Sequence, residues 1–342
     1  MQSLITEGKA KAYVHLGKIS RRLEVFYNPV MKHNRDITVL VLKAMKRKNL
    51  IAALPLEASG IRGIRIIKEV PGVKHVFMND GNPKAAVLMK KNLNLNIING
   101  NKITVFNLDA DQFFQHIPSG DYIDIDPFGS PTPFLDAAIK KLKRGGILAV
   151  TATDLGALAG TFPAACRRKY WAEPLYTASM HESGIRILIR RVQLVAASYD
   201  RALLPVFSYF KDHYYRVFFI DAKGKANVDR ILKQHGLIAH AGPMWKGLLW
   251  DAKLVNQCAK RCEDSELRKF LSLLAEESSI PGILFFDIHD LAKRHHVHAF
   301  KRMGDVLKKL RSKGFKASRT HFIGWGLRTN APERAVLNAL KR

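Results

Sequence analysis

The chain has 342 residues, enough for two domains that each have a hydrophobic core. Its apolar fraction of 47% excludes a mostly disordered protein, and three cysteines are too few for a disulfide framework. Lysine and arginine number 56 against 29 aspartates and glutamates, and this net charge of +27 favours a polyanionic partner.

The N-terminal residues 1–11 contain no apolar signal core, and no apolar run approaches the ~18 residues of a membrane span. With so few cysteines, we expect a cytoplasmic protein in a reducing compartment, without a membrane anchor and acting as a monomer. Cys258 and Cys262 are four positions apart, but no second cysteine pair completes a zinc site. We therefore expect buried thiols and no bound metal.

The first candidate cofactor motif follows a turn at Asn28-Pro29, a helical pattern at 37–45 and an apolar strand-like run at 50–56. Gly60 stands directly after that run, in a turn that leads into a helix. Such a strand, glycine turn and helix start suit a nucleotide-like cofactor, because the missing Cβ lets the backbone approach the ligand. A plain helix-capping turn has the same appearance.

Two further strand ends carry polar residues. A strand at 74–78 ends at Asp80, twenty positions after Gly60, and an acidic residue ~20 positions on binds ribose hydroxyls in βαβ cofactor folds. A helix at 83–95 and a strand at 103–106 follow, and then Asp109. A carboxylate there could meet an adenine amino group, and a helix N-cap is an equal alternative.

The fourth strand, 122–125, ends in Asp126-Pro127-Phe128-Gly129. Proline removes a ladder donor and glycine permits positive φ, so the strand stops here. Asp126 and the carbonyl of Pro127 could accept the two hydrogens of an amino group, while Phe128 lies against a planar base. This arrangement suits amino-group methylation, although an ordinary proline turn is the simpler alternative.

The remaining elements of the first part of the chain complete an α/β pattern. We expect a helix at 134–142, a strand at 147–153, helices at 161–170 and 184–197, and a hairpin formed by 203–210 and 215–221. This order predicts a doubly wound, Rossmann-like parallel sheet with an antiparallel terminal hairpin. Methyltransferases that use S-adenosylmethionine have this layout, whereas dinucleotide dehydrogenases usually lack the hairpin.

A polar segment at 221–229 marks the expected boundary between a domain at 1–222 and a smaller, basic α+β domain at 223–342. Residues 281–342 contain fourteen lysines and arginines against four acidic residues. Helices at 288–296 and 300–311 and a hairpin at 316–328 resemble a winged helix. Basic grooves track phosphates and exposed rings stack bases, so this region favours nucleic acid. Its candidate RNA contacts are Arg294, Lys301, Arg302 and Arg319, and Phe315, Phe322 and Trp325 are candidate stacking rings.

With these residues in view, the chain resembles the tRNA (guanine-26 N2)-dimethyltransferase family of archaea and eukaryotes over nearly its whole length. The most specific blocks are Asn34-Arg35-Asp36, 58–65, Asn79-Asp80, 126–131, 151–154, His181-Glu182, 211–214, 320–322 and 329–332. Several ordered blocks over some 300 residues are stronger evidence than any one of them.

The resemblance implies methyl transfer from S-adenosylmethionine to the N2 amine of guanine 26 in tRNA, giving N2-methyl- and N2,N2-dimethylguanosine. It implies that Arg35 meets the methionine carboxylate of the cofactor, that Asp80 meets its ribose, and that Asp126, with Pro127 and Phe128, is catalytic. The full set of residues expected at the cofactor is Phe26, Arg35, Gly60, Arg62, Asp80, Asp109 and Ala110. Two departures from the family pattern are Leu54, where an acidic residue is frequent, and a cysteine-free 222–245 segment.

Three other functions compete with this one. The same Asp-Pro-Phe edge would serve methylation of adenine N6 or of another guanine in RNA. An NAD-dependent oxidoreductase is disfavoured by the missing Gly-x-Gly and by the terminal hairpin. A non-enzymatic RNA-binding protein with a degenerate pocket is the remaining alternative, and Leu54 is the residue that suggests it.

Overall fold

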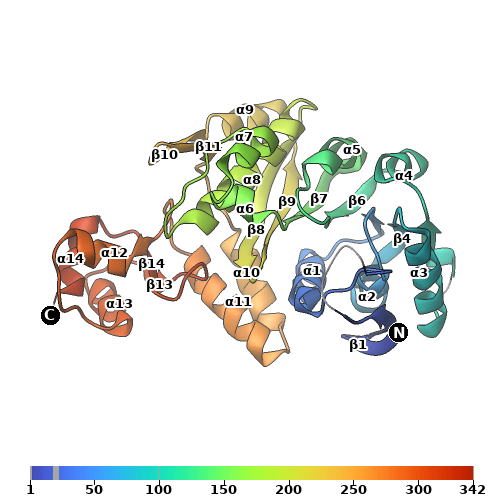
Figure 1. Ribbon diagram of the computed structural model, residues 1–342, viewed down its shortest axis with the longest axis horizontal. Helices are drawn as coiled ribbons and strands as arrows, with labels where there is room; N and C mark the ends of the chain where they lie inside the picture. Colours follow the sequence, from blue (N-terminus) through green and yellow to red (C-terminus); the bar gives the residue numbers. More distant parts are fainter. Residues whose placement is uncertain (1, 18–22, 99, 342) are drawn as a thin grey trace. The chain divides into compact units, whose positions relative to one another are not determined.

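The structure is a computed structural model that describes residues 2–17, 23–98 and 100–341, and its backbone forms two compact units (Figure 1). Unit 1 comprises residues 1–153, 192–204 and 216–232; unit 2 comprises 154–191, 205–215 and 233–342. None of the described helices combines the length and apolar character needed to cross a membrane. The division by function into 1–222 and 223–342 stays a prediction.

Seven strands form one mixed, mostly parallel sheet in the order β5-β4-β3-β6-β7-β9-β8. In that order they are β5 (Ile103–Phe106), β4 (Val73–Asn79), β3 (Leu50–Leu54), β6 (Gly120–Ile125), β7 (Leu142–Ala152), β9 (Tyr214–Ala222) and β8 (Ala202–Lys211). β3 pairs in parallel with both β4 and β6, so the strand order reverses beside β3. Only two residues join β8 to β9, which forces an antiparallel hairpin. The predicted fold class is confirmed.

Helices of unit 1 connect the parallel strands of this sheet, and the first and the last of them stand before and after its strands along the chain. They are α1 (Lys32–Met45), α2 (Ile61–Glu69), α3 (Pro83–Leu95), α4 (Ala110–His116), α5 (Leu135–Lys141) and α9 (Lys225–Leu232), with 3₁₀ turns at Pro29–Met31, Gly100–Lys102 and Thr132–Phe134. α3 begins where predicted, because Asn82 caps the backbone N–H of Lys84 and Pro83 occupies the first turn. The polar segment 221–229 is not simply a linker, since α9 begins within it at Lys225.

An N-terminal hairpin that the sequence patterns above do not predict packs on unit 1. Its strands are β1 (Gln2–Glu7) and β2 (Ala10–His15). Asn92 on α3 and Asn96, the C-cap of α3, bind the main chain of Tyr13 and Lys11 respectively, so the open edge of β2 is satisfied by side chains. The hairpin thereby places Glu7 in the interior, where it is 2% exposed.

Unit 2 contains most of β8, the first two residues of β9 and the remaining elements. They are α6 (Leu155–Leu158), α7 (Pro163–Tyr170), most of α8 (Met180–Ala197), β10 (His235–Ile238), β11 (Ala241–Trp245), α10 (Ala252–Arg261), α11 (Ser265–Ser278), β12 (Phe286–Asp287), α12 (Ile288–Arg294), α13 (Met303–Ser312), β13 (Ala317–Arg319), β14 (Gly326–Thr329) and α14 (Glu333–Leu340). β12, β14 and β13 form a small sheet. It packs with α12, α13 and α14, which lie together in Figure 1, around Leu291, Val306, Leu310 and Val336.

A buried ionic network holds distant segments of unit 2 together. Arg328 on β14 donates to Glu182 on α8 and to Glu277 on α11, and all three side chains are at most 1% exposed. Glu277 also accepts from the Thr320 hydroxyl at 2.5 Å and pairs with the His321 ring at 2.6 Å. Every oxygen of both carboxylates is bound, which is the condition under which a buried ion pair is tolerated.

Removal of the Glu277 charge should destabilise unit 2. In Glu277→Gln, Arg328 is left buried with one of its two counter-charges, and we expect a loss of roughly 3–5 kcal/mol. All four tryptophans lie in unit 2, so chemical unfolding followed by their fluorescence reports this unit. The control is the adjacent Glu276→Gln, which breaks only an exposed pair with Arg311 and should cost less than about 1 kcal/mol.

The same variant has an expected pH dependence. Burial alone would raise the pKa of Glu277, but His321 and Arg328 outweigh burial and lower it to about 2, from 4.5. A lowered folded pKa stabilises the protein above pH 4.5, and this contribution is lost as the pH falls toward 2. The stability gap between wild type and Glu277→Gln should therefore narrow below pH 4.5. A gap that stays constant down to pH 2 would contradict the assignment.

Candidate active site

The predicted site residues of unit 1 follow the carboxyl ends of β3, β4, β5 and β6. Ligands of open α/β sheets bind at this edge, beside the strand where the order reverses. Asn79, at the end of β4, ties three of these strand ends together. Its amide donates to the carbonyls of Pro55 and Leu108 at 2.9 and 3.0 Å and accepts from the N–H of Leu108 at 3.0 Å. The edge is thus fixed by one fully buried side chain.

One face of β6 is polar over its whole length. Tyr122 and Asp124 stand two positions apart and Asp126 follows the strand, so all three point to the same side. Asp124, 3% exposed, receives two bonds from Arg216 at 2.6 and 2.8 Å and a short one from the Tyr122 hydroxyl. Burial alone would raise the pKa of Asp124, but the charges of Arg216 and Arg62 outweigh burial and lower it.

Arg62, in the first turn of α2, connects Asp124 to Asp126. Its Nη1 lies 3.2 Å from Asp124 and donates to Asn34 and Thr38 of α1 at 2.9 and 3.1 Å. Its Nη2 makes a short ion pair with Asp126. The two hydrogens of Nη1 serve Asn34 and Thr38, so its contact with Asp124 is electrostatic. Nη2 donates to Asp126 and fixes the orientation of that carboxylate.

The turn after Asp126 presents an aromatic side chain. Gly129 adopts φ +84° and is clamped to Thr153, whose N–H and hydroxyl bind its carbonyl and its N–H. Phe128 is 43% exposed and packs edge-on against Phe26, with ring centroids 4.1 Å apart. Pro127 is buried. The structure therefore brings the predicted Asp126, Phe128 and Phe26 into one region.

Gly60 has a packing role in the structure. Its φ is +81°, and a Cβ there would lie 2.8 Å from Met78 and 2.9 Å from Met89. The glycine thus allows close packing of α2 against β4 and α3, and its contact with a cofactor stays a prediction.

The carboxylates near the strand ends fit S-adenosylmethionine as hydrogen-bond acceptors. Asp80 is oriented by the N–H groups of Ala58 and Asn82, both at 2.9 Å, and each of its oxygens keeps a lone pair for a ribose hydroxyl. Asp80 itself is half-buried, and the next residue, Gly81, is not crowded, because a Cβ there would have its nearest neighbour 3.8 Å away. Asp109 is exposed at the N-cap of α4, where it binds the N–H of Asp111, and Ala110 is buried directly after it. Asp109 is therefore the helix N-cap, and its exposed carboxylate also lies at the sheet edge where we expect an adenine amino group.

Arg35, the predicted partner of the cofactor carboxylate, is already paired with a carboxylate of the protein. Its Nε and Nη2 donate to Glu7 at 2.8 and 2.6 Å, and Nη2 also donates to the carbonyl of Asn28. A cofactor carboxylate at Arg35 would have to share the guanidinium with Glu7. The contribution of the N-terminal hairpin to this region could not be anticipated, since no local pattern links Glu7 to Arg35.

Glu57 is a site residue that the motifs did not single out. It stands three positions after β3 and accepts the N–H of Gly63 at 2.7 Å. Burial raises the pKa of Glu57 to about 8, so the group is mostly neutral at pH 7. The family pattern frequently has an acidic residue at position 54, where this chain has Leu54. Glu57 nevertheless supplies a buried carboxylic acid three positions further along the chain.

The predicted RNA contacts lie in unit 2, and the structure does not test their role. Arg294 pairs with Asp290 and Glu333 at 2.9 and 3.5 Å, so a phosphate would have to displace them. Arg302 and Arg319 are exposed and Lys301 is half-buried. Among the candidate rings, Trp325 is 48% exposed, but Phe322 is 5% exposed and Phe315 packs on the core, so these two serve packing.

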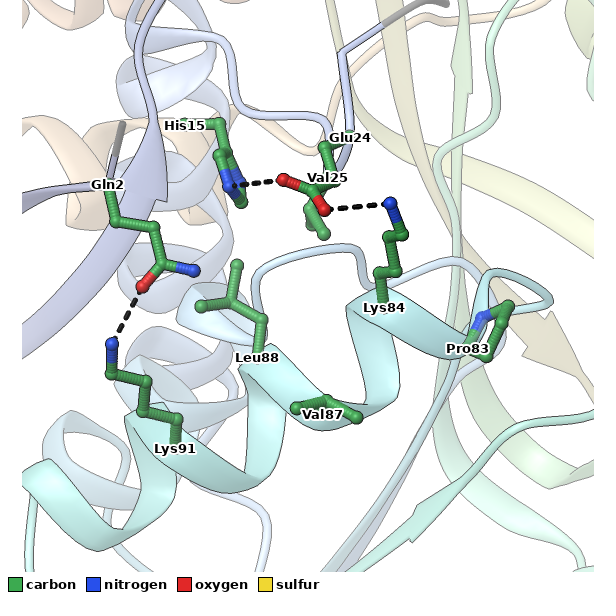
Figure 2. Close-up of a pocket in the computed structure, with 9 residues that line it drawn as sticks. All are labelled: Gln2, His15, Glu24, Val25, Pro83, Lys84, Val87, Leu88 and Lys91. Carbon is green, nitrogen blue, oxygen red and sulfur yellow. Dashed lines mark hydrogen bonds and ion pairs between the residues drawn. The ribbon is translucent and has the colours of Figure 1, made fainter.

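A cavity of about 300 Å³ lies elsewhere in unit 1, beside α3 (Figure 2). Val87 and Leu88 form part of its wall, and Glu24 bridges His15 and Lys84 at 3.1 and 2.8 Å. None of the predicted site residues lines it. Within residues 2–17, 23–98 and 100–341, no group of three or more metal-binding side chains was found.

The strand order and the Asp-Pro-Phe edge beside a strand–turn–helix define a Rossmann-like methyltransferase that uses S-adenosylmethionine. Comparison with known proteins identifies the family within this class. The chain belongs to the N2,N2-dimethylguanosine tRNA methyltransferase family, whose pattern matches residues 3–241 and 238–341.

Similar proteins cover the chain almost completely. A tRNA (guanine(26)-N(2))-dimethyltransferase from Pyrococcus furiosus is 38% identical over 99% of this chain and 98% of its own length. A tRNA (guanine(26)-N(2)/guanine(27)-N(2))-dimethyltransferase from Aquifex aeolicus is 36% identical over 99% of this chain and 95% of its own. Trm1 from Pyrococcus horikoshii, solved with S-adenosyl-L-methionine, has a TM-score of 0.91, is 34% identical, and covers 99% of this chain and 100% of its own.

Loss of the Asp124 charge should loosen the whole site. In Asp124→Asn, two buried arginines lose a shared counter-charge, and we expect the free energy of unfolding to fall by roughly 3–5 kcal/mol. Hydrogen exchange of the β6 and α2 amides measures this locally. The control is Asp121→Asn on the same strand, whose half-exposed pair with Lys143 should contribute less than about 1 kcal/mol. Equal effects of the two substitutions would refute the central role of Asp124.

Proposed function

We propose that this protein transfers methyl groups from S-adenosylmethionine to the N2 amine of guanine 26 in tRNA, giving N2-methyl- and N2,N2-dimethylguanosine. The observation that carries the proposal is the Asp126-Pro127-Phe128 turn at the end of β6, with Asp126 oriented by Arg62. The similar proteins are named tRNA (guanine(26)-N(2))-dimethyltransferases, which supports the same substrate and product.

The chemistry of the site follows from the weakness of the nucleophile. The lone pair of the guanine amine is delocalised into the ring, and S-adenosylmethionine supplies an electrophilic methyl group on a sulfonium. Asp126 and the carbonyl of Pro127 accept the two amine hydrogens, which turns the nitrogen toward a pyramidal geometry. Holding the reacting atoms roughly 3–3.5 Å apart and in line is the principal catalytic device.

Proton removal is assigned to Asp126. Since Arg62 engages its Oδ2, we assign Oδ1 to the guanine amine, and the carboxylate takes one proton for each methyl transferred. Phe128 stacks on the base, with Phe26 packed against its edge. Extrusion of the base from the tRNA costs a few kcal/mol and is offset by contacts from Arg294, Lys301, Arg302 and Arg319 in the basic C-terminal region.

We further propose that the protein acts as a monomer in the cytoplasm. Its three cysteines are buried free thiols, which is consistent with a reducing compartment. The relative named for guanines 26 and 27 makes guanine 27 a second candidate target.

A methylation assay on defined transcripts tests the substrate. We expect label from S-adenosylmethionine to enter an unmodified tRNA with guanine 26, and nucleoside mass spectrometry to find N2,N2-dimethylguanosine. Replacement of guanine 26 by adenine should abolish the signal. Dimethylguanosine that persists in this transcript but disappears when guanine 27 is also replaced would move the target by one position. Methyladenosine would instead indicate an N6 activity.

A substitution at Asp126 tests the mechanism. Asp126→Ala and Asp126→Asn should lower turnover by roughly 10²–10⁴-fold, because the proton acceptor is lost, while tRNA binding persists. The control is Asp136→Asn, an exposed carboxylate paired with Lys140, which should leave turnover unchanged. Normal turnover in both Asp126 variants would remove this residue from the mechanism.

A further inference from the structure

Two adjacent arginines of α8, Arg190 and Arg191, have no carboxylate partner among the described residues. Nε of Arg190 and both Nε and Nη1 of Arg191 are buried without a protein acceptor. Burial lowers the pKa of both guanidinium groups, and Arg191 lowers that of Arg190 further. These two half-buried arginines thus differ from the buried arginines described above, each of which has at least one carboxylate partner (Arg35, Arg62, Arg216 and Arg328).

The nearby carboxylates are committed elsewhere. Glu173 pairs with Arg167 at 2.9 Å, and Asp154 accepts from Tyr170 and Lys169. The charge of Arg190 also reaches His235, whose pKa is lowered to about 4 by burial and by this charge. The region therefore carries positive charge that no carboxylate in the described part of the chain neutralises through an ion pair.

Trp171 lies against the same arginines. The guanidinium of Arg191 stands 3.7 Å from the centre of its ring, and Nη1 of Arg190 donates to its carbonyl at 3.1 Å. The residue caps α7 with φ +55°, and its N–H binds the carbonyl of Arg167. Although one ring face is covered by Arg191, Trp171 remains 57% exposed. A rigid aromatic plane, backed by a cation, is thus presented to solvent.

The segment around α6 and α7 also combines exposed aromatic rings with positive charges. Tyr176 is 73% exposed and Phe162 is 63% exposed, each packed against a glycine of the α6–α7 region. Arg167, Arg168 and Lys169 form the last turn of α7. Unpaired cations beside exposed rings are the combination that proteins use to bind phosphates and stack bases of unpaired or distorted RNA. An acidic peptide would use the charges but not the ring plane.

We propose that Trp171, Arg190 and Arg191 form a second tRNA contact, in which the arginines bind a backbone phosphate and Trp171 stacks an adjoining base. The proposal rests on the proposed function, because tRNA is the expected substrate. It places an RNA-binding site in the α7–α8 part of unit 2, outside the C-terminal residues 281–342 in which the basic composition is most apparent.

Binding of an unmodified tRNA transcript over a range of salt concentrations tests the charges. The double variant Arg190→Gln/Arg191→Gln should bind more weakly, and its slope of log affinity against log salt should decrease by about one. Arg191→Lys keeps the charge and should retain the wild-type slope. The control is Lys253→Gln, an exposed lysine of α10 in the same unit, which should leave affinity and slope unchanged. Thermal unfolding confirms that each variant is folded.

Trp171 is tested separately. Trp171→Ala should weaken tRNA binding roughly ten-fold at an unchanged salt slope, and Trp171→Phe should recover most of the loss. With 5-bromouridine in the transcript, photocrosslinks should map to the tryptic peptide 170–186, which contains Trp171 and Tyr176.

Three outcomes would overturn the site. In the first, the arginine and Trp171 variants bind tRNA as tightly as Lys253→Gln does. In the second, the crosslinks are confined to residues 281–342. In the third, an acidic peptide binds this surface and tRNA does not compete with it. A different result would contradict the proposed methyltransferase activity. A wild-type protein that binds and crosslinks tRNA at 170–186 but transfers no methyl group would refute the enzyme activity and leave this contact in place.

Discussion

A carboxylate buried beneath the sheet edge, Asp124, is the constraint on which unit 1 depends. A lone charge in this interior would be prohibitively costly, so Asp124 requires Arg216 on one side and Arg62 on the other. Arg62 in turn reaches Asp126, and Arg216 reaches Thr38 and Thr151. One buried charge thereby fixes α1, α2, β6, β7 and β9 in a single arrangement. This arrangement also determines the position of Asp126, the candidate catalytic carboxylate.

Unit 2 uses the same principle with different residues. Glu182 and Glu277 come from two helices, and Arg328, from a small sheet, pairs with both. Such networks add little net stability over an apolar core, but removal of one member is costly, and they favour one arrangement over its alternatives. The network gives Glu182, Thr320 and His321 a structural role within the His181-Glu182 and 320–322 blocks.

The parts of this architecture that sequence patterns could predict are those with a local signal. The apolar runs gave the strands, and Asn82-Pro83 gave the start of α3, so the predicted fold class is confirmed. The spacing of Tyr122, Asp124 and Asp126 shows that one face of β6 is polar, but Arg216 lies 92 positions from Asp124 and Arg62 lies 64 from Asp126. Partners at such separations leave no local pattern. For the same reason the N-terminal hairpin, the position of Glu57 and the packing of Gly60 against Met78 and Met89 could be seen only in the fold.

The pairing of buried charges also decides where the net charge resides. Six buried arginines (35, 62, 65, 186, 216 and 328) face seven buried carboxyl groups (7, 36, 57, 124, 182, 221 and 277), of which Glu57 is mostly neutral. The interior therefore cancels to about zero, and the positive surplus of the described residues belongs to their half-buried and exposed side chains. A field of this kind accelerates the encounter with any polyanion alike. Discrimination between one RNA and another must then occur after encounter, through groups held in fixed positions, and abundant unrelated RNA would compete for the enzyme at low ionic strength.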